Sequence, residues 1–305
     1  MSEAMWHFIS DQISQEIGEV FICENAKKIH QQHNHTAYVV RSSQKRFFVK
    51  VCTRESRVED VITPLQAEAD GLMALEKVGA ISTPKVVCFG QCQENQKHYE
   101  YLVLKFIAFK SPSELLWSQA GQQLAELHKR SRDIQLPINA AHYGWHNDNY
   151  IGPTRQKNHT STNWVDFFVQ NRLVDLADQL PQKAQLMGPD VWQKITTILQ
   201  GHDPEPCLLH GDLWIGNIGF CRQQPVIFDP AVWVGDREFD LAMAELFGGF
   251  AKVFFSAYEA TWPLPEGYAK RRLVYQLAPI LNHVLMFDGD YIPQLNLLLD
   301  QIMQA

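Results

Sequence analysis

The sequence predicts an α+β protein of two lobes, a small lobe with an antiparallel β-sheet and one main helix, then a larger and mostly helical lobe. Two patterns predict this order. Strand-like segments rich in β-branched and aromatic residues are concentrated before residue 106, whereas apolar residues at helical spacing dominate after it. At 305 residues the chain is long enough for two cores. We therefore expect an N-terminal lobe over residues 1–105 and a C-terminal lobe over residues 106–305.

The small lobe is expected to begin with an amphipathic helix and to continue as a β-meander. Phe8, Ile9 and Ile13 share one helix face, and a second helix is expected to end before Gly79, which is typical of a C-terminal cap. The expected elements are a helix over Trp6–Ile17, strands at Val20–Cys23, Tyr38–Arg41 and Phe47–Val51, a helix over Pro64–Val78, and strands at Lys85–Gly90 and Tyr101–Phe106.

Two segments of the large lobe have distinct compositions. Residues from Tyr143 to Asn163 are rich in Asn, Gly, His, Thr and Pro, which is typical of a loop, and long loops in compact domains are often functional. From Leu273 to Ala305 apolar residues return at helical spacing, which predicts helices that close this lobe.

The bulk properties exclude several classes of partner. A formal net charge of −7, with no long block of like charges, argues against binding to nucleic acid through phosphate contacts. The richest apolar stretch, Leu241–Tyr258, is interrupted by Glu245 and Lys252, so no membrane span is expected. The N-terminus lacks the pattern of a secretory signal. We expect a cytoplasmic protein that is a monomer or a weak dimer.

The six cysteines are scattered along the chain, which favours reduced thiols over a disulfide framework. Cys88 and Cys92 lie close together with His98 nearby, but no second half of a zinc site accompanies them. We expect no zinc there.

The clearest chemical signal lies between His210 and Asn217. Asp212 is followed five residues later by Asn217, the spacing of the protein-kinase catalytic loop, in which the aspartate accepts the hydroxyl proton and the asparagine holds a metal ion. An isolated His-Gly-Asp is more often a turn with a capping aspartate. Phosphoryl transfer also needs a second carboxylate at the metal, and Asp229 ends an apolar run typical of a short strand. The combination favours a catalytic loop.

Lys50 is the one charged residue in the apolar strand Phe47–Val51, where a buried ammonium group needs a partner. Glu68 on the following helix is able to supply the ion pair that holds such a lysine against nucleotide phosphates. Taken alone, the two residues would be read as a solvent-exposed strand lysine and a solvated helix glutamate. Beside the second-lobe motifs, the ion pair is favoured.

Together these segments resemble the fructosamine kinase family, also called ketosamine kinases, a branch of the aminoglycoside-phosphotransferase-like kinases. The resemblance extends over nearly the whole chain. Its most specific parts are the tryptophan of His-Gly-Asp-Leu-Trp and the Asp-Asn-Tyr-Ile-Gly segment. It rests on Phe48–Lys50, Glu68–Leu72, Asp148–Gly152, Trp164, Phe167–Phe168, Arg172–Leu173, His210–Asn217, Ile227–Ala231 and Gly235–Met243.

The resemblance implies a bilobal protein-kinase-like fold and phosphorylation of the 3-hydroxyl of a fructosamine or ribulosamine, with ATP and Mg²⁺. The sugar then leaves the amine spontaneously, so the result is deglycation of an amino acid, a protein or a smaller metabolite. By position, the resemblance assigns Asp212 as the catalytic base and Asn217 and Asp229 as metal ligands. The residues assigned to ATP are Lys50, Glu68, Lys105 and Ile107, and those assigned to the substrate are Trp214, Asn149, Tyr150, Asp236 and Glu238. His210 and Asp240 are assigned to support of the catalytic loop.

Several assignments have structural alternatives. Trp214 is expected to be a platform for the sugar, but a tryptophan is also commonly part of a core. Asp240 is expected to accept backbone N–H groups of the catalytic loop and not to touch the substrate.

The sequence departs from the family pattern in the loop between the first two strands. We expect this loop at Ile29–Ala37, and it contains no glycine where relatives bring backbone close to phosphates. His30, His33 and His35 within it raise the alternative of a metal cluster, although such spacing is more often incidental. Lys105 at the hinge replaces an acidic residue of the family, which leaves nucleotide preference open.

Two other functions remain open. One is a kinase for another amino sugar or amino alcohol. The other is a pseudokinase that binds nucleotide without chemistry, which the glycine-free loop suggests and the retained Lys50, Asp212 and Asp229 argue against.

Overall fold

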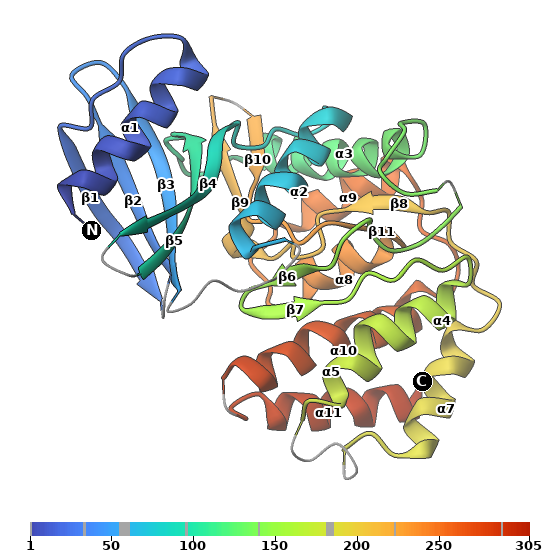
Figure 1. The fold of residues 1–305 in the computed structure, drawn as a ribbon. Coiled ribbons are helices and arrows are strands. Elements are labelled where there is room, and N and C mark those ends of the chain that lie inside the picture. The colour runs from blue at the N-terminus through green and yellow to red at the C-terminus, as the bar shows by residue number, and fades with distance from the viewer. Residues whose placement is uncertain are drawn as a thin grey trace.

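An antiparallel sheet of five strands forms the first part of the chain (Figure 1). The computed structural model describes residues 2–32, 35–54, 62–94, 97–139, 141–180, 186–222, 224–287 and 289–305. The strands follow the spatial order β1-β2-β3-β5-β4. They are β1 (Asn25–Gln32), β2 (His35–Arg41), β3 (Arg46–Arg54), β4 (Val86–Glu94) and β5 (Lys97–Lys105).

Two helices pack on opposite faces of this sheet. Successive side chains of β3 point to opposite faces, so each helix covers every second residue of the strand. Phe47 and Val49 join the apolar cluster under α1 (Glu3–Ile17). Phe48 and Cys52 belong to the cluster under α2 (Pro64–Val78). Lys50 has the parity of Phe48, so it points to the face of α2 and the second lobe. Helix α2 ends at Gly79, which has a left-handed backbone as its capping position requires.

The expected strand at Val20–Cys23 is wrong. Phe21 is buried, but its backbone N–H donates to the side chain of Ser14, and the N–H of Cys23 donates to that of Ser10. The segment is therefore hydrogen-bonded to helix α1 and is not paired with a strand. The alternation of apolar residues that predicted a strand arises because the segment packs on that helix.

The expected loop at Ile29–Ala37 is mostly a hairpin. Residues up to Gln32 belong to β1 and residues from His35 belong to β2, with Gln32 opposite His35. Positions 33 and 34 lie outside the described residues. His30 and Gln31, two of the polar residues that suggested a loop, are exposed on the edge strand β1.

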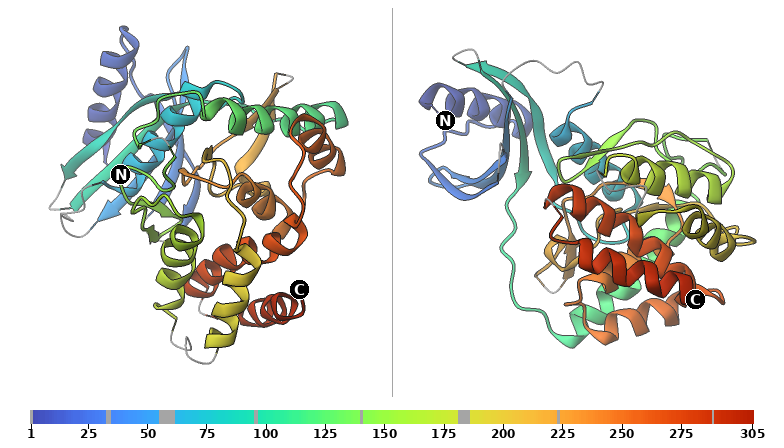
Figure 2. Two further views of the ribbon diagram at one scale, coloured as in Figure 1. Left: turned by 90° about the vertical axis from the view of Figure 1, so that its right-hand side faces the viewer. Right: turned by 90° about the horizontal axis from the view of Figure 1, so that it is seen from below.

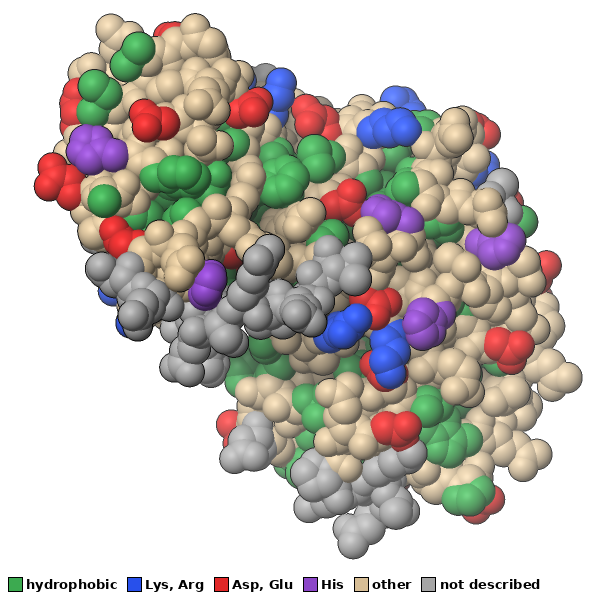
Figure 3. All heavy atoms as spheres, viewed as in Figure 1, with side chains coloured by type: hydrophobic (Ala, Val, Ile, Leu, Met, Phe, Trp, Pro, Cys, Tyr) green, Lys and Arg blue, Asp and Glu red, His purple; other side chains and the backbone are tan. Residues whose placement is uncertain are grey.

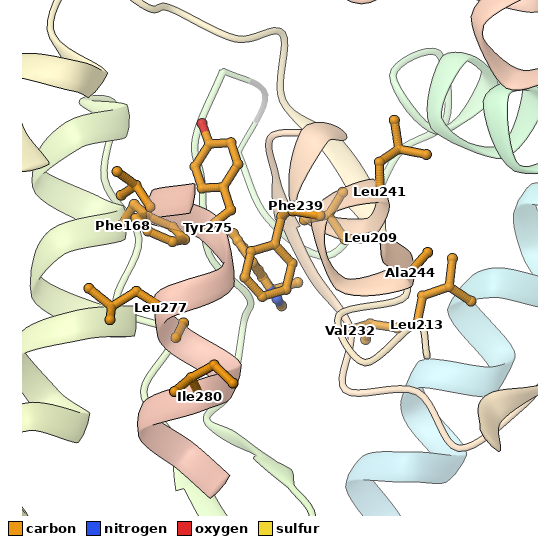
Figure 4. Packing of buried hydrophobic residues seen from close by; sticks show 14 of the residues in the cluster. Phe168, Leu209, Leu213, Val232, Phe239, Leu241, Ala244, Tyr275, Leu277 and Ile280 are labelled. Carbon is orange, nitrogen blue, oxygen red and sulfur yellow. The ribbon is translucent and has the colours of Figure 1, made fainter. Parts of the chain in front are cut away.

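The second lobe is mainly helical and begins after an extended segment, residues 106–113, that leaves the sheet (Figure 2). Its helices are α3 (Glu114–Ser131), α4 (Trp164–Phe168), the π-helix η1 (Val169–Val174), α5 (Asp175–Ala177), α7 (Pro189–Leu199), α8 (Glu238–Leu246), α9 (Lys252–Thr261), α10 (Tyr268–Met286) and α11 (Ile292–Gln304). Figure 4 shows Phe168, Phe239 and Tyr275 meeting in its core.

Short strands in the second lobe position the loops between its helices. The pairs are β6 (Asn149–Ile151) with β7 (Thr154–Gln156), β8 (Cys207–Leu209) with β11 (Trp233–Gly235), and β9 (Ile218–Cys221) with β10 (Gln224–Ile227). The expected loop Tyr143–Asn163 thus contains the β6–β7 hairpin. A 3₁₀ turn, η2 (Ile215–Asn217), precedes β9.

The surface agrees with the charge pattern of the sequence. On the face shown in Figure 3, Lys and Arg side chains are scattered among Asp and Glu and do not form one basic field. This face therefore gives no support to nucleic-acid binding. Within the described residues, none of the helices combines the length and apolarity needed to cross a bilayer.

Candidate active site

The catalytic loop begins where the buried strand β8 ends. Gly211 has φ +79°, and a Cβ at this position would lie 2.0 Å from the carbonyl oxygen of Ala231. Glycine is therefore required at this turn, and the turn leads directly to Asp212.

Asp240 holds this turn in place. Its buried carboxylate accepts the backbone N–H groups of His210 at 2.7 Å and Gly211 at 2.9 Å. It also lies 3.2 Å from Nε2 of His128, whose Nδ1 contacts the hydroxyl of Tyr258 at 2.8 Å. These are the contacts of a residue that supports the loop. The sequence carries no signal for His128 or Tyr258, since a single His or Tyr on a helix matches no motif.

His210 joins the catalytic loop to the segment before Asp229. Its Nε2–H donates to the carbonyl oxygen of Phe228 at 3.0 Å, and its Nδ1 accepts the backbone N–H of Asp212 at 3.3 Å. Burial lowers the pKa of His210 below its ordinary value, although the charge of Asp240 opposes this. The ring is therefore neutral, as this hydrogen-bond pattern requires.

Asp212 and Asn217 are in direct contact. The side-chain amide of Asn217 donates to Oδ2 of Asp212 at 3.0 Å and to its backbone oxygen at 2.9 Å. Burial, followed by the negative charge of Asp229, raises the pKa of Asp212 to about 7. A carboxyl group that titrates near neutral pH is suited to accept a proton in a general-base step. Because the side-chain amide nitrogen of Asn217 donates to Asp212, the side-chain amide oxygen of Asn217 is directed away from Asp212.

Lys50 connects three elements that are far apart in the sequence. Its Nζ lies 2.8 Å from both carboxylate oxygens of Glu68 and 2.6 Å from Oδ1 of Asp229. Burial alone would lower the pKa of Lys50, but the negative charges of Asp229 and Glu68 outweigh burial and raise it. The ammonium group is therefore charged and is suited to hold nucleotide phosphates.

Asp229 brings a carboxylate to this cluster from the end of β10. Its φ of +57° lies in the left-handed region that few non-glycine residues adopt, and such strain is concentrated at functional sites. Its side chain is 43% exposed, so it remains accessible while Oδ1 contacts Lys50. The carboxylate of Asp229 and the amide oxygen of Asn217 are hard oxygen donors, so this pair fits Mg²⁺.

Helix α2 is docked on the second lobe immediately after Glu68. At Gly71 an added Cβ would lie 3.2 Å from both methyl groups of Val232. The next contact is polar, because Asp70 accepts a hydrogen bond from the indole N–H of Trp145 at 2.9 Å. These contacts fix the helix that positions Glu68 against Lys50.

Replacing Asp70 with alanine is expected to weaken ATP binding about tenfold. A hydrogen bond to a charged group contributes about 1.5–3 kcal/mol, and its loss loosens the helix that carries Glu68. Titration calorimetry would measure the Kd for ATP. Glu76→Ala, at an exposed position on the same helix, is the matched control. An unchanged Kd in Asp70→Ala would show that the docking of α2 does not depend on this contact.

Trp214 lies at the surface beside the catalytic loop and is 39% exposed, so it is not a core residue. Its ring covers Gly216, where an added Cβ would lie 2.3 Å away, and it meets Phe247 edge-on with 6.4 Å between ring centroids. Its backbone N–H donates to the carbonyl oxygen of Asp212 at 3.2 Å. An indole in this position is able to support a sugar ring.

The structure gives Asn149 a supporting position, which corrects its assignment to the substrate. Asn149 is buried, and its amide nitrogen donates to the carbonyl oxygen of Val232 at 2.7 Å. Its Oδ1 accepts from Gln156 and Asn158, each at 2.9 Å. Asn149 therefore braces the backbone that follows Asp229.

Arg172 completes this brace and is a residue that sequence reasoning left without a role. Its buried guanidinium donates to Oδ1 of Asn158 at 2.6 Å and lies 4.2 Å above the ring of Trp233. Tyr150, on the same hairpin as Asn149, is half-buried, and its assignment to the substrate stays a prediction.

Asp236 and Glu238 are not part of the cluster around Asp212, which corrects their assignment to the substrate. They follow the end of β11 that lies farthest from the catalytic loop along the β8–β11 ladder. Asp236 contacts Nε2 of His202 and accepts the hydroxyl of Tyr275, both at 2.6 Å. Glu238 is buried and pairs through both oxygens with Arg271 at 2.6 and 2.8 Å. Both carboxylates are thus committed to internal contacts.

Replacing Glu238 with glutamine is expected to destabilise the fold by about 3–5 kcal/mol, because Arg271 would remain buried without its counter-charge. Urea unfolding would measure the change in free energy. Glu126→Gln, which breaks the exposed ion pair with Arg130, is the control and is expected to cost less than about 1 kcal/mol. Equal effects of the two variants would contradict the assignment of a buried structural pair.

Among the described residues, one further group of side chains has the geometry of a metal site. In the described part of the chain, this group consists of three residues whose possible ligand atoms all lie within 4.8 Å of one another, namely His202, Asp236 and Glu238. Arg271 already occupies Glu238, so a second cation would have to compete with it. No such described group includes the earlier candidates Cys88, Cys92, His98, His30 and His35. His33 lies outside the described residues.

The end of β5 and the segment after it contain two residues assigned to ATP, Lys105 and Ile107, and an aromatic residue, Phe109. The backbone N–H of Lys105 donates to the carbonyl oxygen of Lys85 at 2.9 Å, so it is not free for a nucleobase. Ile107 is half-buried. Phe109, which the sequence did not single out, stacks on Phe228 with 5.1 Å between centroids. The roles of Lys105 and Ile107 in ATP binding stay predictions.

Comparison with known proteins identifies the family of the chain. A family model of fructosamine kinase matches residues 5–305. The chain belongs to the fructosamine kinase family. Proteins of Vibrio cholerae and Synechocystis, each named a probable ketoamine kinase, are 33% and 35% identical to this family member over 302 and 309 residues. The alignments cover 98% and 99% of this chain, and 99% and 98% of the two relatives.

Solved structures give the same result. A Haemophilus somnus protein assigned as a fructosamine-3-kinase has a TM-score of 0.85 at 28% identity, over 96% of both chains. An aminoglycoside phosphotransferase in complex with ADP and hygromycin B has a TM-score of 0.65 at 11% identity, over 97% of this chain and 98% of that one, which shows a shared fold. The expected family and the bilobal kinase-like fold are confirmed, and family membership makes the chain a ketosamine kinase.

Proposed function

We propose that this ketosamine kinase transfers the γ-phosphoryl group of ATP to the 3-hydroxyl of a fructosamine or ribulosamine. The observation that carries the proposal is the convergence of Lys50, Asp229, Asp212 and Asn217 in one cluster beside the exposed ring of Trp214. This arrangement supports a nucleotide on one side of Asp212 and a sugar on the other.

On the nucleotide side, Lys50 is held by Glu68 and presents its ammonium group to the phosphates. Asn217 and Asp229 would hold Mg²⁺, which neutralises the charge of the phosphates during transfer. Most of the catalysis in such a site comes from position and charge, because the protein forms no covalent bond to the phosphoryl group.

On the acceptor side, Asp212 receives the proton of the attacking hydroxyl group. The hydrogen bond from Asn217 fixes the orientation of its carboxyl group, and Trp214 supports the face of the sugar. The phosphorylated sugar then separates from the amine spontaneously, so the amine is restored. The outcome of the reaction would be deglycation.

The test is Mg²⁺-dependent ATP consumption with a synthetic fructosyl-lysine or ribulosyl-lysine analogue, with the product identified by phosphorus NMR. The control substrate is the matching 3-deoxy analogue, which has no hydroxyl group at the proposed position. Turnover of the parent compound alone is the expected result. Equal turnover of the 3-deoxy analogue would place the transfer on another hydroxyl, and turnover of neither compound would point to another acceptor.

A further inference from the structure

A series of aromatic rings extends from the catalytic loop along the surface of the second lobe. Trp214 contacts Phe247, Phe247 contacts His283, and His283 contacts both Phe287 and Tyr291. We call these five residues the aromatic ridge. They come from the loop after β8, the end of α8, the end of α10 and the turn before α11, which are four separate segments of the sequence.

The ridge lies at the surface and not in the core. Trp214 and Phe287, at its two ends, are 39% and 37% exposed, and the three residues between and beside them are half-buried. Ring centroids along it are separated by 6.4 Å, 4.8 Å and 5.4 Å from Trp214 to Phe287. The five rings therefore form one connected series of contacts, with an exposed ring at each end.

The ridge is uncharged. Nδ1–H of His283 donates to the carbonyl oxygen of Pro279 at 2.7 Å, and burial lowers the pKa of His283. The neutral ring then has an acceptor at Nε2, which has no hydrogen-bond partner among the described residues. Aromatic faces attract apolar groups and also cations. The surface is therefore suited to an apolar group attached to an ammonium nitrogen.

The ridge is continuous with the candidate active site. The backbone N–H of Trp214 donates a hydrogen bond to the backbone oxygen of Asp212. One end of the ridge therefore lies beside the proposed catalytic carboxylate. At the other end, Met286 packs against the β6–β7 turn, because an added Cβ at Gly152 would lie 3.2 Å from its methyl group. The hairpin that carries Tyr150 therefore lies against Met286, the residue that precedes Phe287.

We propose that the aromatic ridge binds the amine substituent of the ketosamine and selects an apolar or aromatic substituent over one that carries a carboxylate. The inference rests on the proposed function. The sugar lies at Trp214 beside Asp212, the ammonium nitrogen lies against the ring faces, and the substituent extends across Phe247 and His283 to Phe287. A carboxylate would lose its hydration there without gaining a cation from the ridge.

The test compares N-fructosyl-benzylamine with N-fructosyl-glycine, which carry the same sugar. The wild type is expected to show a kcat/KM at least about tenfold higher for the benzylamine adduct. Phe287→Ala should lower that value about tenfold and change the value for the glycine adduct less than twofold, whereas Phe287→Tyr should retain the preference. Leu297→Ala removes a comparably exposed apolar side chain on α11 and should change neither value.

The outcomes separate the two proposals. If the wild type turns over both adducts with equal kcat/KM, or if Phe287→Ala affects both equally, the ridge is not the substituent site and the proposed function stands. If neither adduct is phosphorylated although calorimetry shows ATP binding, the proposed function fails and the inference fails with it.

Discussion

Replacing Asp212 with alanine is expected to reduce kcat for ketosamine phosphorylation by about three orders of magnitude or more while the fold remains intact. Asp212 is the carboxylate proposed to receive the hydroxyl proton, and general-base catalysis with its positioning contributes a factor of this size. The measurement is ketosamine-dependent ATP consumption at saturating concentrations of both substrates. Asp11→Ala, an exposed carboxylate on α1, is the matched control.

The stability of the Asp212→Ala variant provides an independent check. Because burial raises the pKa of Asp212 from 3.8 to about 7, the metal-free folded protein binds a proton there that the unfolded chain has released. This group therefore lowers stability as the pH rises from about 4 to 7. The variant should lose that part of the pH dependence, as measured by urea unfolding. Near-normal turnover in the variant would remove Asp212 from the mechanism.

Replacing Asp229 with alanine is expected to abolish Mg²⁺-dependent turnover, with a loss of about three orders of magnitude or more that added Mg²⁺ does not restore. The change removes a proposed metal ligand and one of the two carboxylates on Lys50. Turnover measured over a range of Mg²⁺ concentrations would show this. Asp300→Asn, at an exposed position on α11, is the control.

A second variant separates charge from backbone strain. Asp229→Asn keeps a side chain that tolerates the left-handed conformation, so a similar loss of activity in both variants would assign the effect to the carboxylate. Activity that still depends on Mg²⁺ in both variants would mean that the metal is held by other residues.

The sequence predicts the cluster around Asp212 well because each member sits in a local pattern with a physical requirement. Lys50 is a charge in an apolar strand, so it needs the carboxylate that Glu68 supplies. Asp212 and Asn217 lie on one turn, and their separation along the chain limits how far apart they are in space. Such short-range constraints are visible without a structure.

The polar residues of the other motifs are a different case. Asn149, Asp236 and Glu238 occur in motifs as specific as that of Asp212, yet they brace backbone or pair with buried side chains. Which partner a buried polar group meets depends on long-range contacts, such as Glu238 with Arg271 across 33 positions. The strand expected at Val20–Cys23 failed for the same reason, because its partners are the serines of α1.

The close fit of α2 against the second lobe also bears on inhibition. Gly71 leaves no room for a side chain against Val232, and Asp70 is hydrogen-bonded to Trp145, so a compound that has to push this helix outward would disrupt both contacts as well as the Lys50–Glu68 pair. A competitive inhibitor is therefore expected to leave the helix in place. Such an inhibitor is better extended away from α2, from the nucleotide site past Asp212 toward Trp214.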